Sequence, residues 1–205
     1  MNICYIVCYV RNKHRQKSVK KEPSIQTETL IDTYIRKLTK SLKYKITWSQ
    51  TSALFNNVLG VPPGTLGADI LKSGKLQLDN LYPHIDQVQN EKVLAVLRNT
   101  SGYVITTNKN EYVSKLVVIA IGYTNLLSIK GLESYVEPHP KAALEKNRIW
   151  LKNEDYLVDA GLYVAGTLAG GRSQFAIASG SGAQVATDIL TLWNNGKHTK
   201  VHDKV

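Results

Sequence analysis

A strand, a glycine-containing turn and a helix follow one another near the carboxyl end of this 205-residue chain. The strand ends at Gly166, and Gly170 and Gly171 in the turn allow the backbone to approach a planar ligand closely. The helix predicted from about Gln174 offers N–H groups without helical acceptors, at the positive end of its dipole. This pattern predicts a site for a flat, negatively charged group. The alternative is a turn between strand and helix that holds no ligand.

Cysteines and histidines show no comparable arrangement. Cys4 and Cys8 would lie about 13 Å apart on one face of a strand, too far for a disulfide, or side by side on a helix. We interpret them as small buried hydrophobic residues. His139 lies between prolines in EPHPK, which predicts a surface residue in a loop. No spacing in the sequence indicates a metal site, a Ser/His/Asp triad or a carboxylate pair.

Three segments carry a more specific pattern. The first is FNNVLGVP at residues 55–62, and the second is a strand meander that ends in AIGY at 120–123. The third consists of GLYVAGT at 161–167 and SQFAIA at 173–178. In order, spacing and residue type, these segments resemble the FAD-dependent thioredoxin-reductase-like flavoproteins of the pyridine nucleotide-disulfide oxidoreductase family.

The resemblance covers about residues 48–195 and is strongest with the small single-domain members of that family. Those members share a tryptophan-containing loop before the first segment and a short tail with histidine and aspartate, which Trp48, His202 and Asp203 match. The first segment corresponds to the family's loop beside the isoalloxazine ring. The second corresponds to its Ala-Thr-Gly turn, with Ile121 in place of threonine, and the third to its "AGD" motif, with Thr167 in place of aspartate.

The resemblance implies FAD as the cofactor and a non-covalent site at the start of the last helix. Reduced flavin carries negative charge near N1 and the C2 carbonyl, which a helix N-terminus stabilises. The implied cofactor-binding residues are Gly166, Thr167, Ser173, Gln174, Phe175, Ala176, Gly122, Tyr123, Asn56 and Asn57. No catalytic residue and no metal ligand is implied.

The chain departs from the family at its amino end. All 14 glycines lie at or after Gly60, so the G-x-G-x-x-G turn that holds the FAD pyrophosphate has no counterpart. Arg11, Lys13 or Arg15 could supply charge but not the tight turn. We therefore expect FAD to be weakly held at its adenosine half, or absent.

The redox Cys-x-x-Cys of the family is also missing. About 40 residues separate Gly122 from Gly161, too few for a doubly wound NADPH domain. An unknown redox partner would have to exchange electrons with the flavin, and a homodimer is left open.

The expected fold class is α/β, a Rossmann-like FAD/NAD(P)-binding domain with a central parallel sheet, a small antiparallel meander and helices on both faces. Residues 1–48 form a divergent basic segment with a β-α-β order, residues 49–195 the FAD-binding domain of thioredoxin-reductase type, and residues 196–205 a polar tail. The predicted strands are 2–10, 44–48, 85–88, 92–98, 103–107, 112–121, 149–152 and 162–164, and the predicted helices are 24–41, 66–81 and 174–193.

The net charge of +10 is concentrated in residues 1–48, which hold 11 Lys/Arg and 3 Asp/Glu. Such a segment could contact nucleic acid or an acidic protein surface, but a solvated loop is the favoured interpretation, so nucleic acid is not expected as a partner. No apolar run reaches the roughly 18 residues of a membrane span, and the opening MNICYIVCYV lacks the order of a signal peptide. The expected localisation is cytoplasmic, without membrane association.

These observations favour an FAD-binding redox flavoprotein that depends on a partner. The first alternative is a degenerate or truncated flavin domain without catalysis. The second is an interaction protein whose basic segment binds an acidic partner.

Overall fold

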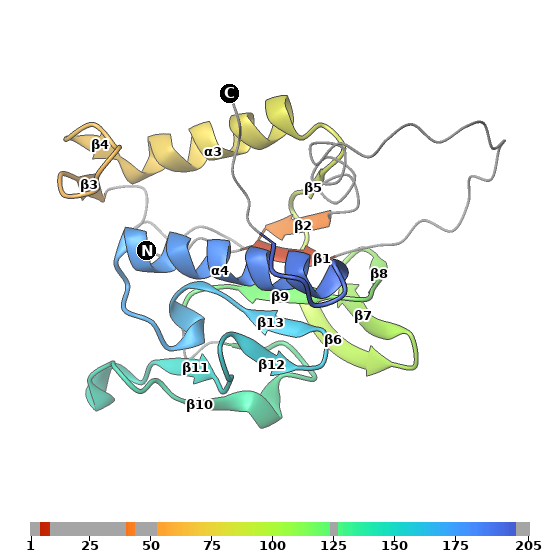
Figure 1. Ribbon diagram of the computed structural model, residues 1–205. Helices are drawn as coiled ribbons and strands as arrows, with labels where there is room; N and C mark the ends of the chain where they lie inside the picture. The colour runs from red at the N-terminus through yellow and green to blue at the C-terminus, as the bar shows by residue number, and fades with distance from the viewer. Residues whose placement is uncertain (1–4, 9–39, 44–52, 124–126, 200–205) are drawn as a thin grey trace, which may run out of the picture.

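The computed structural model describes residues 5–8, 40–43, 53–123 and 127–199 (Figure 1). A six-stranded sheet in the order β12-β13-β9-β1-β2-β5 forms its centre. The strands are β12 (Leu157–Asp159), β13 (Leu162–Val164), β9 (Val117–Ala120), β1 (Tyr5–Cys8), β2 (Lys40–Lys43) and β5 (Asp86–Val88).

The sheet is mixed, which corrects the expected parallel sheet. β9 is parallel to β13 and β2 is parallel to β5, but β1 is antiparallel to both β9 and β2. β1 and β2 are antiparallel neighbours, and the second strand of the predicted β-α-β order, 44–48, lies outside the described residues. The apolar run in β9 indicated a strand that is covered on both faces. Its side chains are fully buried on one face and partly buried on the other, but burial carries no information on strand direction.

The predicted helix over 24–41 and the predicted strand over 44–48 lie largely or wholly outside the described residues. The described strand in this region is β2, at Lys40–Lys43. Of the two cysteines, Cys8 is the last residue of β1, and Cys4 lies outside the described residues.

The antiparallel meander is confirmed as β6 (Val93–Asn99), β7 (Gly102–Thr107) and β8 (Glu111–Ser114). The predicted strand over 112–121 is in fact two strands, because the chain leaves the meander after Ser114 and enters the main sheet as β9. Two short ribbons complete the strands: β3 (Leu54–Phe55) with β4 (Thr65–Leu66), and β10 (Val136–Pro138) with β11 (Ile149–Leu151).

Two α-helices occur in the described part of the chain, α3 (Gly67–Leu81) and α4 (Phe175–Trp193). Both match their predicted ranges within one residue. Short 3-10 helices occupy Glu133–Tyr135, Leu144–Lys146 and Gly166–Ala169. Among the described helices, none combines the length and the apolar composition of a membrane span.

β9 separates two apolar layers because its side chains alternate between the faces of the sheet. Val117 and Ile119 are fully buried on the side of the meander, in a core that also contains Ile105. Val118 and Ala120 face α4, whose Val185 and Ile189 pack against this side. One face of the sheet around β9 and β13 is therefore covered by α4 and the other by strands, where helices were expected on both.

A buried carboxylate closes the open end of the meander. Glu91 accepts hydrogen bonds from Thr107 Oγ1 at 2.7 Å, Asn110 Nδ2 at 2.7 Å and Tyr112 Oη at 3.0 Å. Burial raises the pKa of Glu91, but the three hydrogen bonds to its charged form outweigh this effect and leave the pKa below the ordinary value of 4.5.

We expect this carboxylate to make the meander acid-sensitive. Because the pKa is lower in the folded state, the stabilisation is fully present above the ordinary pKa and is lost as the pH falls through the folded value. Glu91→Gln should lower the free energy of unfolding at pH 7 by about 1–3 kcal/mol and reduce its decline toward pH 3. Urea unfolding at both pH values measures this, with the exposed Glu111→Gln as the control. Equal acid sensitivity of wild type and Glu91→Gln would contradict it.

Candidate functional site

The turn between β13 and α4 has a defined backbone geometry. Ala165 donates its N–H to Ile119 O at 2.9 Å, which fixes the end of β13 beside β9. Gly166 has φ 75°, in the left-handed region that favours glycine, and a Cβ there would meet no atom within 4 Å. Ser181 of α4 accepts the Gly166 N–H at 2.7 Å and donates to Ala178 O. The first residue of the turn is thereby tied to the second turn of the helix.

The start of α4 carries no side-chain cap. The side chain of Gln174, at the N-cap position, makes no capping hydrogen bond. The first backbone hydrogen bond of the helix runs from the Ala178 N–H to Gln174 O. The N–H groups of Phe175, Ala176 and Ile177 therefore have no acceptor within the helix. They form the positive end of a 19-residue helix.

The three segments singled out in the sequence meet at this turn. The ring of Phe55, in β3, lies edge-on to the ring of Phe175, with centroids 5.5 Å apart and planes at 68°. Tyr123, just after β9, donates its backbone N–H to Thr167 Oγ1 at 3.2 Å. The loop of the first segment and the turn of the second therefore both contact the third.

His139 is buried beside this turn, with 6% of its surface exposed, so the expectation of a surface histidine is wrong. Its Nδ1 accepts the backbone N–H of Lys141 at 3.1 Å, which makes Nε2 the protonated nitrogen, and Nε2 lies 3.1 Å from Thr167 O. The imidazole ring also packs on Tyr123, with centroids 5.3 Å apart. The flanking prolines indicated a loop correctly, but this loop packs inward.

Tyr123 also contacts Arg148, whose guanidinium carbon lies 5.0 Å from the ring centroid. This distance is within the range of a cation–π contact. The segment that contains β10 and β11 therefore supports the turn through His139 and Arg148. Neither residue was part of the predicted site.

The predicted cofactor-binding residues differ in how they are exposed. Thr167 and Gly122 are buried, whereas Gly166, Tyr123 and Phe175 are partly buried. The exposed members are Ser173, Gln174, Ala176, Asn56 and Asn57. Two polar side chains are already engaged: Thr167 Oγ1 by Tyr123, and Asn56 Oδ1 by the Gly64 N–H at 2.8 Å.

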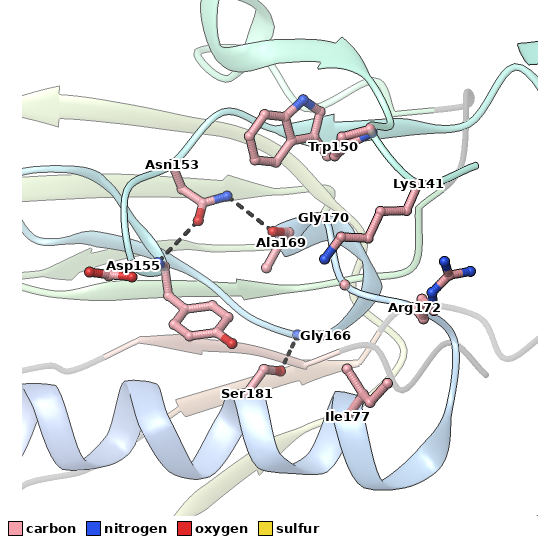
Figure 2. Close-up of a pocket in the computed structure, with 13 residues that line it drawn as sticks. Lys141, Trp150, Asn153, Asp155, Gly166, Ala169, Gly170, Arg172, Ile177 and Ser181 are labelled. Carbon is pink, nitrogen blue, oxygen red and sulfur yellow. Dashed lines mark hydrogen bonds between the residues drawn. The ribbon is translucent and has the colours of Figure 1, made fainter. Parts of the chain in front are cut away.

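A cavity of about 490 Å³ lies next to the turn, on the side of β11 (Figure 2). Of the predicted residues, only Gly166 lines it. The other lining residues are Pro140, Lys141, Trp150, Asn153, Asp155, Tyr156, Ala169, Gly170, Gly171, Arg172, Ile177 and Ser181. A Cβ at Gly170, which has φ 89°, would lie 2.8 Å from Trp150 Cε3, so the indole packs directly on the backbone of the turn.

Most of the titratable groups with shifted pKa values lie away from the turn. Burial raises the pKa of Tyr103 to about 12, and the Asp159 carboxylate adds to this rise. Asp159 accepts the Ala160 N–H, the Tyr135 hydroxyl and Arg98 Nη1, which keep its own pKa low. This network joins the meander to β12, so its role is structural. In the residues described here, no perturbed acid or base points to proton transfer at the turn.

No protein-family model matches the chain, and no curated protein sequence matches it. Solved structures are similar in fold. A thioredoxin reductase from Gloeobacter violaceus aligns with a TM-score of 0.59 at 11% identity, over 75% of this chain and 85% of that one. A ferredoxin-flavin thioredoxin reductase from Clostridium acetobutylicum aligns with a TM-score of 0.58 at 12% identity, over 83% and 94%. A second structure of a ferredoxin-flavin thioredoxin reductase from Clostridium acetobutylicum aligns with a TM-score of 0.51 at 14% identity, over 73% of this chain and 87% of that one. The chain thus has a thioredoxin-reductase-like α/β fold.

Proposed function

We propose that this chain is a redox flavoprotein that holds the isoalloxazine ring of FAD at the start of α4 and exchanges electrons with a partner. The observation that carries the proposal is the meeting of the three segments at one turn, through Phe55 with Phe175 and Tyr123 with Thr167. Segments that resemble a flavin site in sequence, and that also converge in space, support a common role better than any one of them alone.

The residues at the start of α4 fit the ring half of the cofactor. Backbone N–H groups of Phe175 and Ala176 are available as donors, and the open space beside Gly166 leaves room next to the turn. A bound flavin supplies reversible uptake of electrons. The positive end of α4 stabilises negative charge and therefore favours the reduced cofactor. Phe55 and Phe175 provide apolar surface that excludes water from one side.

The residues near β1 do not fit the diphosphate half. In dinucleotide-binding folds the pyrophosphate lies on the turn after the first strand, at the carboxyl edge of a parallel sheet. Here Tyr5 pairs with Ala120 and Cys8 with Val117, so the chain leaves β1 at the edge opposite the turn after β9. Arg11, Lys13 and Arg15, which follow, lie outside the described residues. The direction of β1 and the missing glycines both support weak retention of the adenosine half.

The same feature favours the alternative, a degenerate flavin domain without catalysis. A chain that has lost its phosphate turn could keep the fold and the convergence of the three segments without retaining cofactor. The two proposals differ in whether contacts to the isoalloxazine half alone give the chain a measurable affinity for flavin.

The test is titration of the purified chain with FAD and with FMN, followed by flavin absorbance near 370 and 450 nm or by flavin fluorescence. Because the adenosine half has no described contact, FAD and FMN should bind with affinities within about tenfold of each other, a difference of 1.4 kcal/mol. Ala176→Glu should weaken the binding of FAD and of FMN by about fivefold and lower the midpoint potential of the bound flavin by about 20 mV. The reason is that the substitution places a negative charge beside the backbone N–H groups at the start of α4.

Ala186→Glu is the matched control, because it adds the same charge to an exposed position further along α4. A glutamate in the first turn also favours helix formation, so weaker binding by Ala176→Glu cannot be attributed to unfolding. Failure of both flavins to bind would support the degenerate domain. Binding that is unaffected by Ala176→Glu would place the ring elsewhere.

A further inference from the structure

The cavity beside the turn has two aromatic walls and a glycine floor. Trp150 of β11 packs on the backbone of Gly170, and Tyr156 lines the cavity from the turn before β12. Gly166 and Gly171 contribute only backbone to the lining, which also includes Asn153, Ala169 and Ile177. Its volume of about 490 Å³ lies within the range of small-molecule sites.

Tyr156 reaches this position through an unfavourable backbone conformation. Asp155 has φ 45° and Tyr156 φ 71°, and the backbone groups of Glu154 and Leu157 exchange hydrogen bonds of 3.0 and 2.8 Å. These are the features of a two-residue type I′ turn, whose second central position favours glycine. A bulky residue in this region is strained, and such strain is concentrated at functional sites.

Asn153 holds the strained turn against the floor of the cavity. Its Oδ1 accepts the Tyr156 N–H at 3.0 Å and its Nδ2 donates to Ala169 O at 3.3 Å (Figure 2). The same Nδ2 also donates to Leu151 O at 2.6 Å. The ring of Tyr156 packs in part against the apolar layer beneath α4. The rest of the side chain lines the cavity, so packing alone would not require a tyrosine rather than a smaller residue with a relaxed backbone.

Two cations stand at the mouth. Lys141 and Arg172 both line the cavity, and the ammonium group of Lys141 points toward the space between Gly170 and Gly166 (Figure 2). Within the described ranges neither residue forms an ion pair, and Asp155 is the one acidic residue in the lining. Ser181 and Asn153 are satisfied by protein groups, so the charged side chains of the lining are Lys141, Arg172 and Asp155, two of which are cationic.

We propose that this cavity binds a small aromatic phosphate of the nucleoside monophosphate class. The aromatic ring lies between Trp150 and Tyr156, which provide the flat apolar surfaces that stacking requires. The phosphate lies at the mouth, where Lys141 and Arg172 donate charge-assisted hydrogen bonds. The site shares Gly166 with the proposed flavin site but does not involve Phe55 or Phe175, and AMP binding can be measured whether or not the chain binds flavin.

The experiment is calorimetric titration of the purified chain with AMP, adenosine and ribose 5-phosphate, in parallel with quenching of Trp150 fluorescence. Saturable binding of AMP is expected with a Kd of about 10–500 μM. Adenosine, which lacks the phosphate, and ribose 5-phosphate, which lacks the ring, should each bind at least tenfold more weakly. Trp150→Phe should remove most of the quenching while retaining a stacking ring.

The double variant Lys141→Gln/Arg172→Gln should weaken AMP binding at least tenfold. Lys130→Gln/Lys146→Gln removes the same charge from exposed positions outside the cavity and should leave the Kd unchanged. All four side chains are exposed, so neither double variant is expected to impair folding. No saturation by AMP up to 10 mM, equal affinity for adenosine, or equal weakening by the two double variants would each overturn the proposal.

Discussion

Gly131→Ala is expected to lower the free energy of unfolding by about 3 kcal/mol or more. Gly131 has φ 92°, and a Cβ there would overlap the carbonyl oxygen of Val96 and lie 2.9 Å from Leu97 Cδ2. The backbone has little freedom to move away, because Val96 donates its N–H to Lys130 O and Lys130 donates to Leu94 O, both at 2.9 Å. Strain at the left-handed position and overpacking against a fixed strand therefore act together.

Gly74→Ala is the matched control for this substitution. Gly74 lies inside α3, and a Cβ there would meet no atom within 4 Å. Alanine in a helix interior is favoured over glycine, so the control should be neutral or more stable by up to about 1 kcal/mol. Chemical denaturation of the two variants measures both effects. A Gly131→Ala protein within 1 kcal/mol of wild type would show that the backbone around β6 adapts more readily than its hydrogen bonds indicate.

His139→Leu is expected to destabilise the protein by about 2–4 kcal/mol and to weaken binding at the turn. Leucine fills a similar space but leaves the carbonyl of Thr167 and the N–H of Lys141 without the partner that the imidazole provides. Both backbone groups lie beside a buried residue, so each costs desolvation free energy once its hydrogen bond is lost. Tyr123 also loses the ring on which it packs.

Urea unfolding and flavin titration of His139→Leu test this expectation, with the exposed His198→Leu as the control. His139→Gln should recover part of the stability, since an amide can donate to one group and accept from the other. If His139→Leu were as stable as wild type, the imidazole would not be supporting the turn, and the link between β10, β11 and the start of α4 would have to lie elsewhere.

The local elements near the proposed site could be predicted from the sequence. The glycines at 166 and 170, both at positive φ, and the apolar spacing beyond them defined the turn and α4, because backbone conformation and helical periodicity are properties of neighbouring residues. The meander was predictable for the same reason, since alternation and turn residues mark each of its strands. The resemblance to flavoproteins added the expectation that Phe55 and Tyr123 belong to the same region.

The direction of β1 could not be predicted, because strand pairing is decided by contacts between distant residues. Its apolar residues fit a central strand in either direction, and a missing glycine turn left the direction undetermined. The cavity was missed for a related reason. Trp150 and Tyr156 become neighbours of the turn only through tertiary packing, and a tyrosine at φ 71° stands where sequence rules would place glycine.

The antiparallel pairing of β1 also has a consequence for the order in which the chain assembles. Tyr5 pairs with Ala120, so β1 is secured by contacts that span more than half of the chain. The hairpins of β6, β7 and β8 involve near neighbours, and β9, β13 and α4 follow within the second half. Loop-closure entropy rises with the length enclosed, and non-local pairs form later in folding. The turn at Gly166 can thus be in place before β1 docks, although β1 is synthesised first.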